Sequence, residues 1–228
     1  MNTFQDIASP ASLNRSIAKT FLWMMIGLVV TAITSIVCLV TGFWYTLLTS
    51  VSPLIIMLAQ LGIVIWFSAS MRSASPAKLK TLFLLYAVSL GITLTPISLV
   101  YSQGLIAMAF FITAVYFGLL AIVGLTTKKD LTKLGTLCMV ALITMVITQL
   151  VMMIFRFNME TRLFSIIGLL IFTGLTAWDM QRMKVGLANT DGEIQEKFSI
   201  YMAFEIYLDF INIFLYILRL LGIGSSRD

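Results

Sequence analysis

The sequence predicts an all-α integral membrane protein with seven transmembrane helices. Hydrophobic residues make up 60% of its 228 residues, and charged residues make up only 11%. A soluble domain is about 25% charged, so this composition suits a bilayer. Seven apolar runs follow one another, and a helix of about 20 residues crosses a membrane. We expect a single membrane domain over residues 1–228, with spans at about 20–41, 53–70, 79–101, 105–125, 131–154, 163–181 and 200–221.

The first three runs have clear boundaries. The run at 20–41 exceeds the apolar region of a cleavable signal peptide, about 7–15 residues, and lacks a small-residue cleavage site, so we interpret it as a retained span. Ser52-Pro53 and Ser75-Pro76 precede the next two runs. A serine followed by proline is typical of a helix start. Pro96 lies inside the third run, where it removes a backbone hydrogen bond and predicts a bend.

Short polar segments separate the remaining runs. Residues 102–104 (SQG) lie between the third and fourth runs, and Asp130 can cap the fifth helix. The sixth run ends in residues 179–182 (DMQR). Residues 189–192 (NTDG) form a turn signal before the last run.

The basic residues predict the orientation. Cytoplasmic loops carry an excess of lysine and arginine. With the expected spans, eleven lysines and arginines lie on the side of the N-terminus and four lie on the opposite side. We therefore expect a cytoplasmic N-terminus and an outer C-terminus. The richer side holds Arg15, Lys19, Arg72, Lys78, Lys80, Lys128, Lys129, Lys133, Arg182, Lys184 and Lys197, and the poorer side holds Arg156, Arg162, Arg219 and Arg227.

The seventh run carries a polar stripe on an otherwise apolar helix. At 100° per residue its polar members fall within roughly 80° of one another. An ionised acid at the bilayer centre costs about 2.5–3.5 kcal/mol on insertion scales, so this face should meet protein or water. The stripe consists of Tyr201, Glu205, Asp209, Asn212, Tyr216 and Arg219.

Further charged residues should approach this stripe from other spans. At 1.5 Å per residue, Glu205 lies about 10 Å and Asp209 about 16 Å from the cytoplasmic entry of the last span. Asp179 should lie roughly 5–8 Å deep on the sixth span, and Arg72 ends the second. We expect three acids and one arginine to converge in the cytoplasmic half. Protons, a bound cation or a neighbouring arginine must neutralise the acids.

Several function classes are excluded or disfavoured. The chain has no histidine, so histidine-dependent nucleophilic catalysis and histidine-ligated zinc are ruled out. Cys38 and Cys138 lie in apolar runs and are expected to be packing residues. The net charge of +5 comes from short loops, where it indicates contact with anionic lipids and not with nucleic acid. The final span contains no lysine to bind retinal. We expect neither an enzyme nor a cofactor.

Three motifs together resemble the Bax inhibitor family of membrane proteins, specifically its bacterial members. The resemblance covers essentially the whole chain in the same order. The motifs are residues 207–214 (YLDFINIF) with 218–222 (LRLLG), residues 176–181 (TAWDMQ), and residues 126–131 (TTKKDL) with 134–135 (LG).

This resemblance implies a fold and a function. The last span is expected in the centre, wrapped by the other six, in a bacterial inner-membrane protein that leaks calcium in a pH-sensitive manner. Asp179 and Asp209, linked by Arg72, would form the pH gate. Glu205, Asp209 and Asn212 would line the ion pathway. Glu205 departs from many bacterial members; together with Asp209 it suits Ca²⁺, which prefers oxygen ligands.

Two alternatives stay open at the level of sequence. The acids are protonated and only hydrogen-bond the helices together, or the protein is a non-conducting regulator that binds and modulates a membrane-bound protease, as the resemblance also implies. A leak would depend on the acidic stripe. A regulator would depend on exposed termini or lipid-facing surfaces.

Overall fold

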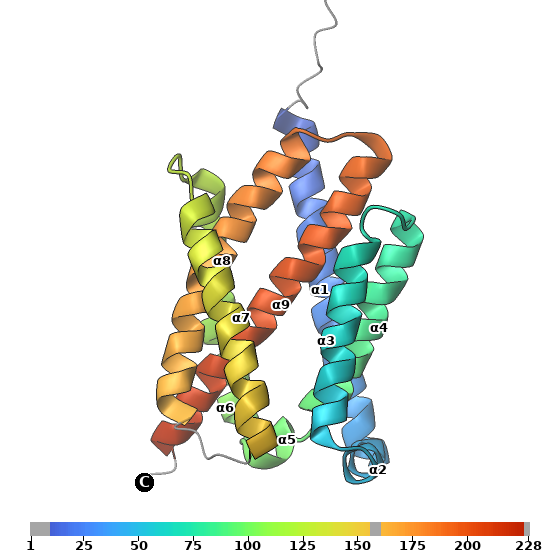
Figure 1. Ribbon diagram of the computed structural model, residues 1–228, viewed down its shortest axis with the longest axis vertical. Coiled ribbons are helices and arrows are strands. Elements are labelled where there is room, and N and C mark those ends of the chain that lie inside the picture. Colours follow the sequence, from blue (N-terminus) through green and yellow to red (C-terminus); the bar gives the residue numbers. More distant parts are fainter. Residues whose placement is uncertain (1–9, 156–160, 226–228) are drawn as a thin grey trace, which may run out of the picture.

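The computed structural model describes residues 10–155 and 161–225, and these ranges contain helices and no strand. The all-α prediction is therefore confirmed for the described chain (Figure 1). The helices are α1 (Pro10–Thr41), α2 (Phe43–Ser50), α3 (Pro53–Ser70), α4 (Pro76–Leu94), α5 (Ile97–Val100), α6 (Gln103–Thr126), α7 (Thr132–Phe155), α8 (Thr161–Ala188) and α9 (Gly192–Ser225).

Six of these segments are long and apolar enough to cross a membrane. They are α1, α4 with α5, α6, α7, α8 and α9. The helix α3 is apolar but shorter; its 18 residues extend about 27 Å, slightly less than the hydrocarbon core of about 30 Å. The chain is a multi-pass membrane protein, and the count of seven spans stays a prediction.

Glycine and proline set two helix boundaries. Gly42 has a φ of 71°, a left-handed conformation that suits glycine, and it separates α1 from the short helix α2, which the sequence did not predict. At Pro96 the helix is interrupted between α4 and α5, where a bend was expected. Pro96 has no N–H to donate to Ile92, whose carbonyl accepts from the Thr95 N–H at 3.3 Å instead. The Thr95 hydroxyl donates to the Gly91 carbonyl at 2.9 Å.

The loop between α6 and α7 is held by side-chain hydrogen bonds near the start of α7. Asp130 Oδ1 accepts hydrogen bonds from the Thr132 hydroxyl at 2.6 Å and from its N–H at 2.9 Å. Asp130 therefore binds the first N–H of α7 from one residue before the N-cap position, which Leu131 occupies. These bonds hold the pKa of Asp130 below its usual value. From α8, the Gln181 side chain donates to the Lys129 carbonyl at 2.8 Å and accepts from the Leu131 N–H at 2.9 Å. The glutamine of the 176–181 motif thus fixes the loop.

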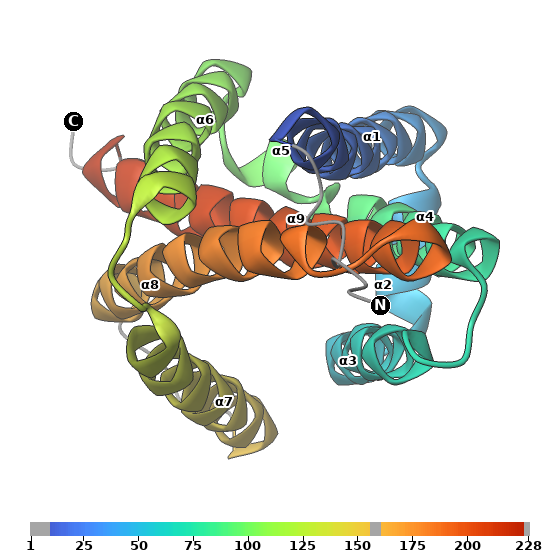
Figure 2. The same ribbon diagram turned by 90° about the horizontal axis from the view of Figure 1, so that it is seen from above.

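The helix α9 runs obliquely through the molecule and packs against α1, α4, α6 and α8 (Figure 2). The helix α3 packs mainly on α4, and α7 packs on α8. They reach α9 at side chains such as Phe67 of α3, whose ring lies 4.1 Å from that of Phe204, and Met145 of α7. Both views show α3 and α7 standing apart. The expected wrapping of α9 by all six helices is not confirmed, because it is interrupted between α3 and α7.

The N-terminal end of α9 is fixed to α1 and α4 by polar contacts. Glu196 pairs with Lys80 at 2.7 Å and with Lys19 at 3.6 Å. A hydroxyl–hydroxyl hydrogen bond of 2.8 Å joins Thr20 to Ser199. The ends of three helices are therefore tied together at one side of the membrane domain.

A buried contact region fixes the back of α9 at mid-helix. The Tyr207 hydroxyl shares a 2.6 Å hydrogen bond with Thr31, which also donates to the Ala87 carbonyl at 3.1 Å. The rings of Phe83 and Phe204 meet edge to face at 5.5 Å. Because α1 and α4 hold this face firmly, the opposite face of α9 is directed toward the gap between α3 and α7.

Candidate functional site

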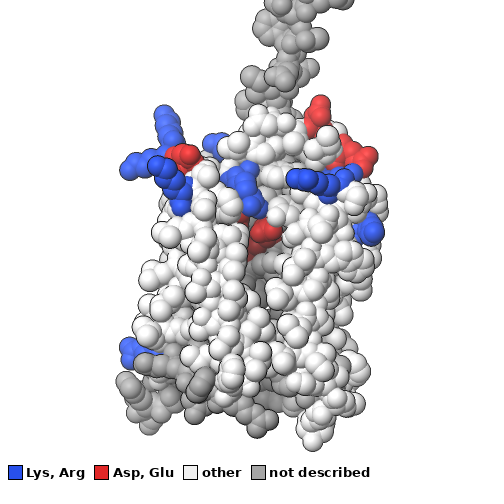
Figure 3. Space-filling view, viewed as in Figure 1, with Lys and Arg blue, Asp and Glu red and all other residues white. Residues whose placement is uncertain are grey.

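A cavity of about 370 Å³ lies on that opposite face of α9, between α3, α7 and α8. Five of the six residues of the polar stripe line it, namely Glu205, Asp209, Asn212, Tyr216 and Arg219. The space-filling view shows acidic atoms inside a hollow, below a band of basic groups (Figure 3). The periodicity of α9 therefore identified the polar residues that this helix contributes to the cavity; its apolar lining residues, Leu208 and Leu215, lay outside the predicted stripe.

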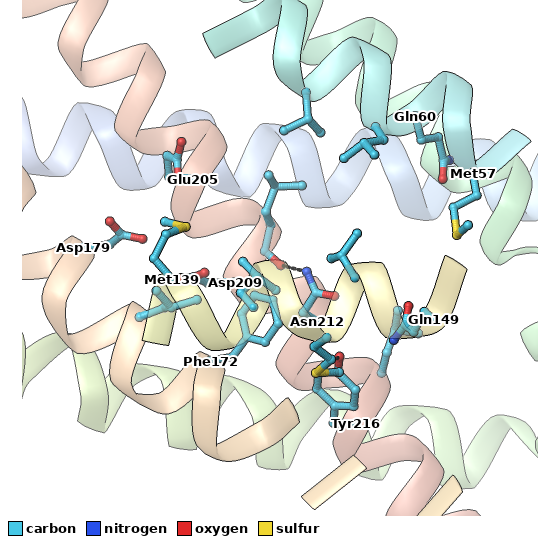
Figure 4. Close-up of a pocket in the computed structure, with 18 of the residues that line it drawn as sticks. Met57, Gln60, Met139, Gln149, Phe172, Asp179, Glu205, Asp209, Asn212 and Tyr216 are labelled. Carbon is cyan, nitrogen blue, oxygen red and sulfur yellow. Dashed lines mark hydrogen bonds between the residues drawn. The ribbon is translucent and has the colours of Figure 1, made fainter. Parts of the chain in front are cut away.

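Two buried aspartates lie at the N-terminal end of the cavity with respect to α9. Asp179 of α8 is 2% exposed and Asp209 is 4% exposed. Within the described chain, Oδ2 of Asp209 and the neighbouring Thr176 hydroxyl have no hydrogen-bond partner. Glu205 lies at the same end of the cavity (Figure 4).

Arg182 forms ion pairs with two of these acids, Asp179 and Glu205. One of its nitrogens, Nη2, lies 3.4 Å from Oδ1 of Asp179 and 3.9 Å from Oε2 of Glu205. The guanidinium also lies over the rings of Trp178 and Tyr201, at 4.8 and 5.6 Å from their centroids. Aromatic faces attract such cations. Arg182 thus joins α8 to α9 beside the end of the cavity.

Arg72 does not take this position. It lies exposed in the turn after α3, and no ion pair of Arg72 occurs in the described part of the chain. The helix α3 ends at Ser70, so the side chain is free to extend into water. The structure therefore does not bring Arg72 to Asp179 and Asp209, and its part in a pH gate is not supported by its position. The three acids do lie at one end of the cavity, but the arginine beside them is Arg182 and not Arg72, the arginine expected from the sequence.

Amide side chains continue the polar lining beyond the acids. Gln60 of α3, Gln149 of α7 and Asn212 of α9 face the cavity from three helices (Figure 4). Gln60 donates to the Thr93 hydroxyl at 2.9 Å, and Asn212 donates to the Leu208 carbonyl at 2.8 Å. Arg219 lies at the far end and stacks over Tyr216 at 5.7 Å. From Glu205 to Arg219 the cavity follows α9 for about 21 Å.

Glycine allows close packing behind the cavity. The Tyr216 ring, which lines the cavity, packs directly onto Gly168 of α8. A Cβ at this position would overlap the ring, so a larger residue would displace a wall of the site.

A second cavity of about 400 Å³ lies between α1, α6 and α9. It is lined by apolar residues and a few uncharged polar ones such as Thr31, Ser35 and Gln103. Because no charged side chain lines it, the cavity beside Asp209 is the candidate functional site.

Sequence reasoning missed Arg182, Gln60 and Gln149 as members of the site. Arg182 was counted only as a loop residue at the end of the sixth span, although it follows Asp179 by three residues. That spacing places two side chains on the same face of a helix and could have identified the pair. The two glutamines carried a weaker signal, as isolated amides in apolar runs.

Comparison with known proteins gives consistent results over nearly the whole chain. Residues 13–226 match the family model described as "Inhibitor of apoptosis-promoting Bax1". An uncharacterized protein of Borreliella burgdorferi is 38% identical, covering 92% of both chains. The inner membrane protein YbhL of Escherichia coli strain K12 is 36% identical and covers 93% of both. Uncharacterized protein RP147 of Rickettsia prowazekii is 34% identical over 95% of this chain and 92% of its own.

Proposed function

Since the chain belongs to the Bax inhibitor family, we propose that it is a pH-sensitive leak for cations, calcium included, in a bacterial inner membrane. Asp209 carries the proposal: it is 4% exposed, has an oxygen without a hydrogen-bond partner among the described residues, and lines a cavity. Ionisable groups inside a membrane domain typically mark ion or proton pathways. The resemblance implies that this aspartate belongs to the pH gate, together with Asp179.

The polar residues of the cavity suit a cation path. Carboxylates at one end attract cations, and the amide oxygens of Asn212, Gln60 and Gln149 can replace water around an ion. At the far end Arg219 adds a positive charge that raises the barrier for cations. No three acidic or cysteine side chains of the described chain gather closely enough to hold a metal ion. We therefore propose passage over weak sites such as Glu205 and Asp209, because conduction requires an ion to leave as well as to enter.

The ion pairs of Arg182 suit a gate at the cytoplasmic end. The guanidinium holds α8 to α9 through Asp179 and Glu205. The titratable and charged groups around this point are Asp179 and Arg182 from α8 and Tyr201, Glu205 and Asp209 from α9. Tyr86 from α4 lines the adjoining cavity. Protonation of an acid removes a negative charge from around Arg182, so the ion pairs and the attraction for cations both change with pH.

Calcium flux into liposomes that contain only this protein tests the proposal. Uptake of calcium is expected above that of protein-free liposomes, and it should change across a pH series. Uptake equal to that of protein-free liposomes at every pH would overturn the leak and favour the non-conducting regulator of a membrane-bound protease.

Glu205→Gln separates two roles of this acid. If Glu205 is a cation ligand, the substitution should lower calcium flux several-fold and weaken its block by competing divalent ions, because glutamine lacks the charge. If Glu205 holds a proton, flux should stay near that of the wild type, because glutamine resembles the neutral acid. We expect the first result, since Glu205 pairs with Arg182 at 3.9 Å. Glu193→Gln, at an exposed acid of the same helix, is the matched control.

The orientation is proposed from the distribution of basic residues. Most described lysines and arginines lie at the end of the molecule where α9 begins, as Figure 3 shows; Arg156 and Arg227, counted for the other side, lie outside the described residues. We expect the N-terminus in the cytoplasm and the C-terminus outside. Reporter fusions at the two termini should report opposite sides, and fusions reporting the same side would contradict this orientation.

A further inference from the structure

We propose that the cavity beside Asp209 also binds lipophilic ammonium ions, amphipathic molecules with a positively charged nitrogen and an apolar tail, which enter from the membrane between α3 and α7. The inference shares its site with the proposed leak, but it does not require that ions pass through the protein. Four features of the cavity support it: the charge at one end, the apolar walls, the position between two lipid-facing helices, and the size.

The charge at one end of the cavity selects a cation. Asp179 and Glu205 share one guanidinium, that of Arg182, and Asp209 lies at the same end of the cavity, so negative charge is in excess there when the acids are ionised. Oδ2 of Asp209 has no hydrogen-bond partner in the described chain and is buried at the cavity wall. A buried carboxylate is stabilised by an opposite charge. The acids do not gather into a metal centre, whereas an ammonium group needs only one close carboxylate.

The walls of the cavity suit an apolar tail. Three methionines, Met57 of α3 with Met139 and Met145 of α7, line it together with the ring of Phe172. Methionine side chains adapt to ligands of different shape and are common at promiscuous binding surfaces. Tyr86 and Tyr216 add aromatic faces, which attract quaternary ammonium groups. Apolar walls do not stabilise a small hydrated inorganic ion, but they do stabilise the tail of an amphipathic cation.

The two helices that flank the cavity, α3 and α7, carry exposed apolar residues as well as the residues that line it. Leu58 on α3 and Ile143 and Ile147 on α7 are 47%, 53% and 55% exposed, respectively. In a bilayer these apolar side chains would contact lipid, so the proposed entry between α3 and α7 lies between two lipid-facing helices. A molecule dissolved in the membrane can therefore reach the acids from the side.

The size and length of the cavity fit such a molecule. Its volume of about 370 Å³ lies within the range of about 300–1,000 Å³ of small-molecule sites. The nitrogen would lie beside Asp209 and Glu205, and the tail would extend along α9 toward Leu215. Arg219, about 21 Å from Glu205 along the helix, disfavours a second positive charge at the far end. The geometry thus favours one charged head and one uncharged tail.

Equilibrium binding of dodecyltrimethylammonium tests the inference. The probe carries a permanent positive charge, so only the protein titrates. The protein is placed in phosphatidylcholine nanodiscs in calcium-free buffer, and retention of radiolabelled probe is compared with that of empty discs. Saturable binding above the empty discs is expected, and dodecanol, which has the same tail without the charge, should not displace the probe.

Two variants locate the binding. Asp209→Asn should weaken it by at least about tenfold, because the carboxylate partner of the nitrogen is removed. Val146→Phe fills the cavity from α7 and keeps every acid, so it should also weaken binding of the probe. This variant tests the site independently if Asp209→Asn does not fold. Asp191→Asn, at an exposed acid outside the cavity, should bind as the wild type does.

Retention by the wild type equal to that of empty discs, or unchanged binding in Val146→Phe, would overturn the inference. Calcium flux is measured in parallel on the same preparations in liposomes. Flux without probe binding would overturn the proposed ammonium site and support the leak. Probe binding without flux would overturn the leak and support the ammonium site.

Discussion

Asp209→Asn should flatten the pH dependence of calcium flux. Asparagine resembles a permanently protonated acid of the same shape, so the titration of this buried carboxylate is removed. Flux through the wild type should change by up to about tenfold per pH unit near the transition, and the variant should change by less than about twofold over the same range. The measurement is calcium uptake into liposomes at a series of pH values.

Asp191→Asn is the matched control for this experiment. Asp191 is an exposed acid in the turn before α9, so its substitution changes the net charge equally but leaves the cavity intact. A wild-type pH profile is expected. If Asp209→Asn keeps the wild-type profile too, Asp209 is not the pH-responsive group.

Arg182→Gln should destabilise the protein and raise its calcium leak. The substitution leaves Asp179 and Glu205 without their cation and removes the ion-pair link between α8 and α9. Because the Arg182 side chain is 28% exposed, water offsets part of the loss, and we expect about 1–3 kcal/mol instead of the larger cost of a fully buried pair. In a chain of this size that corresponds to a fall in melting temperature of about 2–12 °C.

Arg72→Gln provides the comparison, since it removes the same charge from a neighbouring surface turn. Arg72 is exposed and has no ion pair in the described residues, so its substitution should change stability by less than about 0.5 kcal/mol and leave the leak unchanged. Thermal unfolding in detergent and calcium flux are the readouts. A larger effect of Arg72→Gln than of Arg182→Gln would mean that Arg72, as the sequence suggested, is the partner of the acids.

The sequence predicted one wall of the site well, because that wall follows from the geometry of a single helix. Five polar residues recur at helical spacing in an apolar run: Glu205, Asp209, Asn212, Tyr216 and Arg219. In a membrane, a polar helix face is stable only when it is turned toward protein or water. The same residues line the cavity. The interruption at Pro96 was predicted for a similarly local reason.

The opposite wall could not be predicted, because it depends on how separate helices pack. Gln60 and Gln149 come from α3 and α7, and nothing in either run specifies that they face α9. The choice between Arg72 and Arg182 depended on the same information. Both arginines lie at the end of a span in the sequence, but α8 continues as a helix to Ala188 and holds Arg182 against Glu205, whereas α3 ends before Arg72.

Cysteine modification along α9 tests most directly whether cations pass over its polar face. In a background with Cys38 and Cys138 replaced by alanine, Asn212→Cys places a thiol midway along the cavity. Val140→Cys, at a 58% exposed position of α7, places one toward lipid as a control. Each protein is reconstituted in liposomes, and its calcium flux is measured before and after a membrane-impermeant, positively charged thiol reagent is added.

Flux through Asn212→Cys is expected to fall sharply on modification, and flux through Val140→Cys should not change. If the reagent labels Asn212→Cys and its calcium flux continues undiminished, ions do not cross the membrane along this face of α9.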